Sequence, residues 1–152
     1  MERFTGHGAA AVGTDKTILN LFNPAAAPTT RGRIWEFDIG SVAAVADQAT
    51  SFYIGRTTAL GTEASGFTPN NLDPAGPAGA YDFGVGHSAE PTYTASKQLF
   101  SVALNQRATF RWVAANDLSM LVLAATQNNG AGLKSSSSTG TPNTQATIFF
   151  TE

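Results

Sequence analysis

Hydrophobic and polar residues alternate over short runs, and helical periodicity is weak along the whole chain. Residues 33–39 show the alternation most clearly. Arg33, Trp35, Phe37 and Ile39 fall on one side of an extended chain, and Ile34, Glu36 and Asp38 fall on the other. The aromatic side is expected to face the core. The pattern therefore predicts a β-strand here and favours an all-β protein.

Further runs of the same kind are separated by Gly, Pro, Asn, Asp and Ser, which are typical of turns. We expect strands at residues 16–22, 51–56 with an extension to 58, 80–85, 98–104, 107–113, 118–124, 133–136 and 144–151. Residues 118–124 are apolar on both faces, which is typical of a central strand. The sequence predicts one core that contains Trp35, Phe37, Phe110, Trp112, Leu121 or Val122, and Ile148 or Phe149.

About eight strands without crossover helices indicate two packed antiparallel sheets, a β-sandwich of jelly-roll type. The number rises to ten if residues 2–12 pair and the long loop contributes a short strand. An immunoglobulin-like sandwich is the alternative fold. We expect a single β-sandwich domain over residues 1–152, with residues 1–12 as either an N-terminal arm or an edge strand.

Residues 60–77 break the alternation and contain three of the seven prolines, Pro69, Pro74 and Pro77. Loops of this length in a small domain are generally functional or contact-making. The segment 1–12 is weakly charged and rich in small residues. We therefore expect residues 60–77 and residues 1–12 to make contacts with a partner.

Charged residues make up 13% of the chain, and the net charge is −2. The nine Lys and Arg residues are spread along the sequence, whereas a nucleic-acid interface needs a basic cluster. The longest apolar stretch, residues 120–125, is far shorter than the ~20 residues that span a bilayer. We expect no nucleic-acid partner, no membrane segment and no secretion signal, and the lack of cysteine excludes disulfides and thiol chemistry.

The residue types that commonly carry out catalysis or bind metals are scattered along the chain. His7 and His87 are not at metal-ligand spacing to other ligands, and both are expected at the surface or in turns. Glu36 and Asp38 share a strand face, but such a pair is typical of a solvated surface. The aromatic residues Trp35, Phe110 and Trp112 would suit a sugar platform only if they faced outward. We expect no catalytic residues, no metal and no cofactor.

Several segments resemble, in their order along the chain, the small β-sandwich proteins encoded beside the major capsid gene in many tailed bacteriophages. They are Thr17-Ile-Leu-Asn-Leu, Arg31-Gly-Arg-Ile-Trp-Glu-Phe-Asp-Ile-Gly, Tyr53-Ile-Gly-Arg-Thr-Thr-Ala-Leu-Gly-Thr, Phe67-Thr-Pro-Asn-Asn-Leu-Asp-Pro, Leu104-Asn-Gln-Arg-Ala-Thr-Phe-Arg-Trp, Asn128-Asn-Gly-Ala-Gly-Leu and Ala146-Thr-Ile-Phe-Phe. The resemblance is one of pattern and turn sequence and covers residues 4–152.

Such proteins act as capsid decoration, or cement, proteins. The resemblance implies a structural virion protein that is made in the host cytoplasm and sits on the capsid exterior. It also implies the major capsid protein as partner, a homotrimer, and no catalytic or cofactor-binding residues. A receptor- or glycan-binding β-sandwich module of a phage tail or fibre is the alternative, because jelly rolls also serve that purpose. A small glycan hydrolase is the third hypothesis, and the missing acid–base pair disfavours it.

Overall fold

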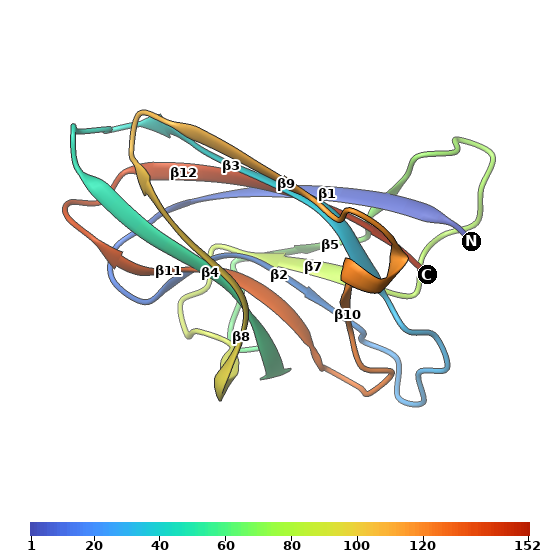
Figure 1. Cartoon of the computed structure of the whole chain (residues 1–152). Coiled ribbons are helices and arrows are strands. Elements are labelled where there is room, and N and C mark those ends of the chain that lie inside the picture. Colours follow the sequence, from blue (N-terminus) through green and yellow to red (C-terminus); the bar gives the residue numbers. More distant parts are fainter.

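The structure is a computed structural model that describes all 152 residues. It contains two antiparallel sheets of six strands each, and the sheets face one another (Figure 1). The first sheet contains β1 (Arg3–Ala11), β3 (Arg33–Ala43), β6 (Asn70–Asn71), β9 (Thr109–Val113), β10 (Leu121–Val122) and β12 (Asn143–Thr151). The second contains β2 (Lys16–Phe22), β4 (Ala49–Ala59), β5 (Ser65–Phe67), β7 (Asp82–Val85), β8 (Thr92–Asn105) and β11 (Gly130–Ser138). The predicted two-sheet sandwich is confirmed, with twelve strands rather than about eight.

Eight of these strands form the jelly-roll pattern. β1 pairs with β12, β2 with β11, β3 with β9 and β4 with β8, so the two halves of the chain run beside each other as one long folded hairpin. The pairs β3–β12 and β4–β11 then join these four ladders into two sheets. Strands β5, β6 and β7 lie between β4 and β8 in the sequence, and β10 follows β9.

The core lies between the sheets and contains Phe37 and Ile148, both fully buried, as predicted. Phe110, Trp112 and Leu121 are half-buried and pack against it from one side. The rings of Phe37 and Trp112 stack with their centroids 5.3 Å apart. These predicted residues do belong to one core, but the members from β9 and β10 form its rim.

Trp35 is outside that core, so its predicted position is wrong. The register of β3 on β12 shifts at this point, because Phe149 pairs with Glu36 whereas Phe150 pairs with Ile34. Trp35 is the extra residue of a β-bulge, and a bulge reverses the alternation on its two sides. Ile34 therefore faces the core, while Trp35 packs against Phe149, with their ring centroids 5.4 Å apart.

Residues 118–124 do not form a central strand, so this prediction is also wrong. Asn116 caps a short 3-10 helix, η1 (Asp117–Ser119), and its Oδ1 accepts hydrogen bonds from the backbone N–H groups of Leu118 and Ser119 at 3.0 and 3.2 Å. The Ser119 hydroxyl accepts from the N–H of Asn116 at 3.0 Å and completes a capping box. Within residues 118–124, only the two residues of β10 form a ladder, with β3 at the edge of the sheet. Local capping overrides the apolar pattern here, and Leu118 is 96% exposed.

The segment 1–12 contains a regular strand, since β1 pairs with β12 along its whole length. On its other side only Phe4 and Thr5 pair, with β6, so most of β1 is an edge. Phe4 and Val12 are buried, which ties both ends of the strand to the core. The first residues of the chain are therefore fixed in position beside β6.

The two histidines lie in different environments. His7 is exposed. His87 lies in the connection between β7 and β8, one of the two kinds of position predicted for it, but it is only 1% exposed and therefore not at the surface. The segment after β7 folds back over the outer face of the second sheet, where the Tyr93 hydroxyl is 2.9 Å from the hydroxyl of Thr17. This covering segment buries His87. No helix in the structure has the length and apolar character needed to span a membrane.

Candidate interaction surface

The two segments predicted to make contacts meet at one end of the sandwich. The N–H of Leu72 donates to the carbonyl oxygen of Arg3 at 2.8 Å, next to the short ladder between β1 and β6. Residues 1–3 and 71–74 line a depression of about 440 Å³ between them. Figure 1 shows the loop that follows β6 projecting beyond the sheets beside both chain termini. The first half of the predicted loop is elsewhere, because β5 pairs with β7 in the second sheet.

The projecting loop is held by its own hydrogen bonds. The Asn71 side chain donates to the carbonyl oxygen of Pro77 at 2.9 Å and accepts from the N–H of Asp73 at 2.8 Å. At the end of the loop, the carboxylate of Glu152 accepts from the N–H of Ala80 at 2.9 Å. Burial raises the pKa of Glu152, and this hydrogen bond partly opposes the shift. The loop therefore has a defined shape before any partner binds.

A second, more apolar depression of about 350 Å³ adjoins the first, because Met1 and Arg3 line both. Its other lining residues are Trp35, Ala114, Asn116, Asp117, Met120 and Thr151. We call the two depressions together, with the exposed side chains of Leu72, Val113 and Leu118 beside them, the terminal surface.

The terminal surface concentrates exposed apolar side chains. Met1 is 81% exposed and Leu118 is 96% exposed, and Leu72 and Val113 are also exposed. These are four of the six large hydrophobic residues that the chain exposes. The other two are Val42, near the end of β3, and Val45, in the connection from β3 to β4, at the far end of the sandwich (Figure 1). A cluster of this kind is typical of a contact site.

Trp35 lines the second depression and has a buried hydrogen-bond donor without a partner. Its ring packs on Phe149, and its Nε1 atom is buried without an acceptor within the chain. Buried indole N–H groups generally have a partner. Sequence reasoning missed Trp35, Leu118 and Met120 as surface residues. The spacing Asn116-x-x-Ser119 is the signal that predicts a capped turn and exposes Leu118.

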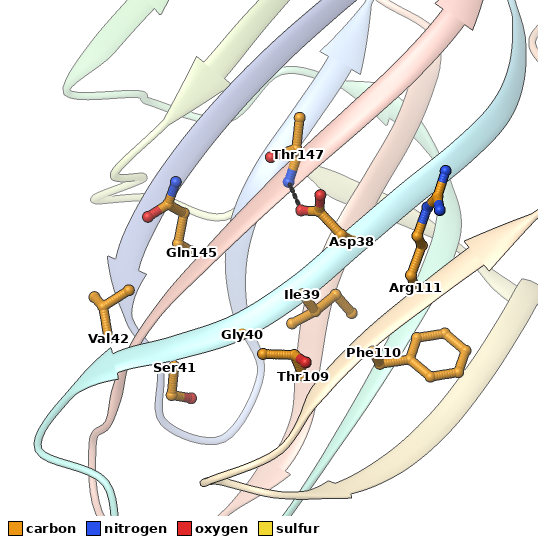
Figure 2. Close-up of a pocket in the computed structure, with 10 residues that line it drawn as sticks. All are labelled: Asp38, Ile39, Gly40, Ser41, Val42, Thr109, Phe110, Arg111, Gln145 and Thr147. Carbon is orange, nitrogen blue, oxygen red and sulfur yellow. Dashed lines mark hydrogen bonds between the residues drawn. The ribbon is translucent and has the colours of Figure 1, made fainter.

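A third depression, of about 450 Å³, lies on the outer face of the first sheet (Figure 2). Asp38 accepts a hydrogen bond from the backbone N–H of Thr147 at 3.1 Å, and Arg111 forms an ion pair with Glu36 at 2.5 Å. Phe110 is the one aromatic residue in the lining, and its ring stacks on Phe100 with their centroids 5.6 Å apart. The polar groups are thus partly engaged already, and the aromatic ring packs toward the core.

No three His, Asp or Glu residues lie close enough together to hold a metal ion. No protein-family model matches the chain, and no curated protein or solved structure is significantly similar to it.

Proposed function

We propose that this chain is a structural virion protein that decorates the outside of a tailed-phage head and stabilises the junctions between capsid subunits. It binds through the terminal surface. The observation that carries this proposal is the convergence of residues 1–3, the loop after β6 and the exposed Leu118 on one end of a rigid sandwich. The resemblance in sequence pattern supplies the identity of the partner, the major capsid protein.

The chemistry of the terminal surface suits a protein partner. Methionine and tryptophan are enriched in the centres of protein interfaces, and charged residues are depleted there. The loop is held by Asn71 and Glu152, so little conformational entropy is lost when a partner binds. These features support a binding role for this end of the molecule.

The role itself follows from mass action. A protein that binds across a subunit junction stabilises the assembled shell by RT ln(1 + [L]/Kd) at each site. We propose that three copies meet at a threefold or quasi-threefold position, as the resemblance implies. The alternative receptor- or glycan-binding role has less support, because the depression in Figure 2 lacks an aromatic platform for a sugar.

Binding to phage heads that lack the protein tests the proposal. Leu118→Glu puts a carboxylate into the terminal surface, whereas Val45→Glu introduces the same charge at the far end of the sandwich. We expect the wild type and Val45→Glu to bind equally, and Leu118→Glu to bind at least about tenfold more weakly. Heads that carry the protein should retain DNA to a higher temperature. Equal binding by both variants, or no binding by the wild type, would contradict the proposal.

A further inference from the structure

β8 is the longest strand of the protein, and it has a free edge. It pairs only with β4, and β5, at the other edge of the second sheet, has three residues. From Ala49–Asn105 to Ile54–Phe100 the β4–β8 register runs without a shift. Natural proteins generally protect such edges with charges, prolines, bulges or short strands. Residues 98–106 contain no charged residue and no proline.

The core is incompletely covered beside this edge. Leu99, Phe100, Val102 and Leu104 of β8 are half-buried and pack against the core. On the opposite sheet, the half-buried Phe110 and Trp112 lie in β9, with centroids 5.6 and 6.1 Å from that of Phe100. These six residues form a seam between two edge strands. A strand added to β8 would bond its free backbone groups and cover this seam.

The charges at the ends of the edge decide which strand fits. Lys97 and Arg107 bracket residues 98–106; both are exposed, and neither has a carboxylate within 4.0 Å. β8 and β9 contain no acidic residue. Antiparallel pairing of β8 with a second copy would place Lys97 near Arg107, and like charges opposite one another destabilise a strand pair. Carboxylates ten residues apart on a partner strand would face both cations.

We propose that the free edge of β8 is a strand-addition site for an extended segment of a capsid subunit, apolar at alternate positions and acidic at both ends. The identity of the partner rests on the proposed function; the site does not. The added strand covers about 30 Å of edge at ~3.3 Å per residue. It holds the protein at a second place, distinct from the terminal surface.

A pair of synthetic peptides tests the site without phage heads. The first is Glu-Val-Ser-Val-Thr-Val-Ser-Val-Thr-Val-Glu, whose valines lie opposite Phe100, Val102 and Leu104 when its glutamates face Lys97 and Arg107, and the second has lysine in place of both glutamates. Binding is measured by fluorescence anisotropy, and hydrogen exchange locates it on the full-length chain. We expect the acidic peptide to bind at least about tenfold more tightly than its twin and to slow exchange in residues 98–105. The variant Lys97→Glu/Arg107→Glu, whose changed residues are exposed, should reverse that preference.

Three results would overturn the proposal. The acidic peptide could fail to protect residues 98–105, or both peptides could bind equally to the wild type and to the variant. Protection of these residues that grows with protein concentration in the absence of peptide would identify a second copy as the occupant. Failure of the peptide test leaves head binding through Leu118 intact. Conversely, failure of head binding leaves a positive peptide result intact.

Discussion

Glu63 and His87 meet over Gly84 on the outer face of the second sheet. A Cβ atom on Gly84 would overlap the carboxylate of Glu63 and would lie 3.2 Å from Nε2 of His87. Both ring nitrogens of His87 and Oε2 of Glu63 are buried without a hydrogen-bond partner. Asn20, which pairs with Gly84 across the β2–β7 ladder, also has an unpartnered buried Nδ2 atom. This polar cluster lies under the segment that covers the sheet.

The cluster makes stability depend on pH. Burial lowers the pKa of His87 below its ordinary value of 6.5, the charge of Glu90 opposes the shift, and Lys16 adds to it. Below about pH 6.5 the unfolded chain therefore binds a proton that the folded chain does not, and stability falls as the pH falls. We expect the melting temperature of the wild type to depend more strongly on pH between 7 and 5 than that of His87→Gln. Identical pH dependence in thermal unfolding of the two proteins would show that His87 is not responsible.

Glu63 changes stability with pH in the opposite direction to His87. Burial, and then the charge of Asp82, raise the pKa of Glu63 above its ordinary value of 4.5. Its contribution to stability is therefore largest at low pH and is lost as the pH rises through the folded-state pKa. The comparison with His87→Gln cancels this effect, because Glu63 is present in both proteins.

Gly130 allows β2 and β11 to approach closely. A Cβ atom there would overlap the carbonyl oxygen of Leu21, which is backbone and cannot move aside as a side chain can. We expect Gly130→Ala to lower the free energy of unfolding by about 1–3 kcal/mol or more in urea titrations. Gly13→Ala is the matched control, since its Cβ would meet no atom within 4 Å. If Gly130→Ala lowered the free energy of unfolding no more than Gly13→Ala does, the close approach of β2 and β11 at Gly130 would be refuted.

The bulge at Trp35 predicts that replacing two aromatic residues of β3 with alanine lowers stability by different amounts. Phe37 is fully buried, so Phe37→Ala should cost about 3–5 kcal/mol. Trp35 is half-buried on the outer face, so Trp35→Ala should cost about 1–2 kcal/mol. Chemical denaturation of both variants checks this order. A larger loss of stability from Trp35→Ala than from Phe37→Ala would show that Trp35 lies in the core and would contradict the bulge.

Sequence reasoning recovers strands whose pairing is regular and fails where a single residue changes the register. Residues 16–22 were predicted as a strand and match β2, because an uninterrupted run between turns needs no knowledge of its partner. The bulge at Trp35 arises from the way β12 pairs with β3, so it cannot be read from β3 alone. The terminal surface depends on the two-residue ladder between β1 and β6, which joins segments more than sixty positions apart.

The cap at Asn116 is local and sets the position of Leu118. Asn116→Ala removes the acceptor for two backbone N–H groups and should cost about 0.5–2 kcal/mol of stability. Because Leu118 then loses its fixed position, binding to heads should also weaken. Thermal unfolding and head binding measure the two effects separately. Unchanged binding by a variant with the expected loss of stability would exclude η1 from the contact.

A reconstruction of phage heads saturated with the protein tests the proposed function most directly. We predict density for the sandwich on the outer surface, in groups of three at capsid junctions, with the end that carries Met1, Leu72 and Leu118 against the capsid. Density confined to the tail, isolated single copies, or copies whose terminal surface faces the solvent would contradict it.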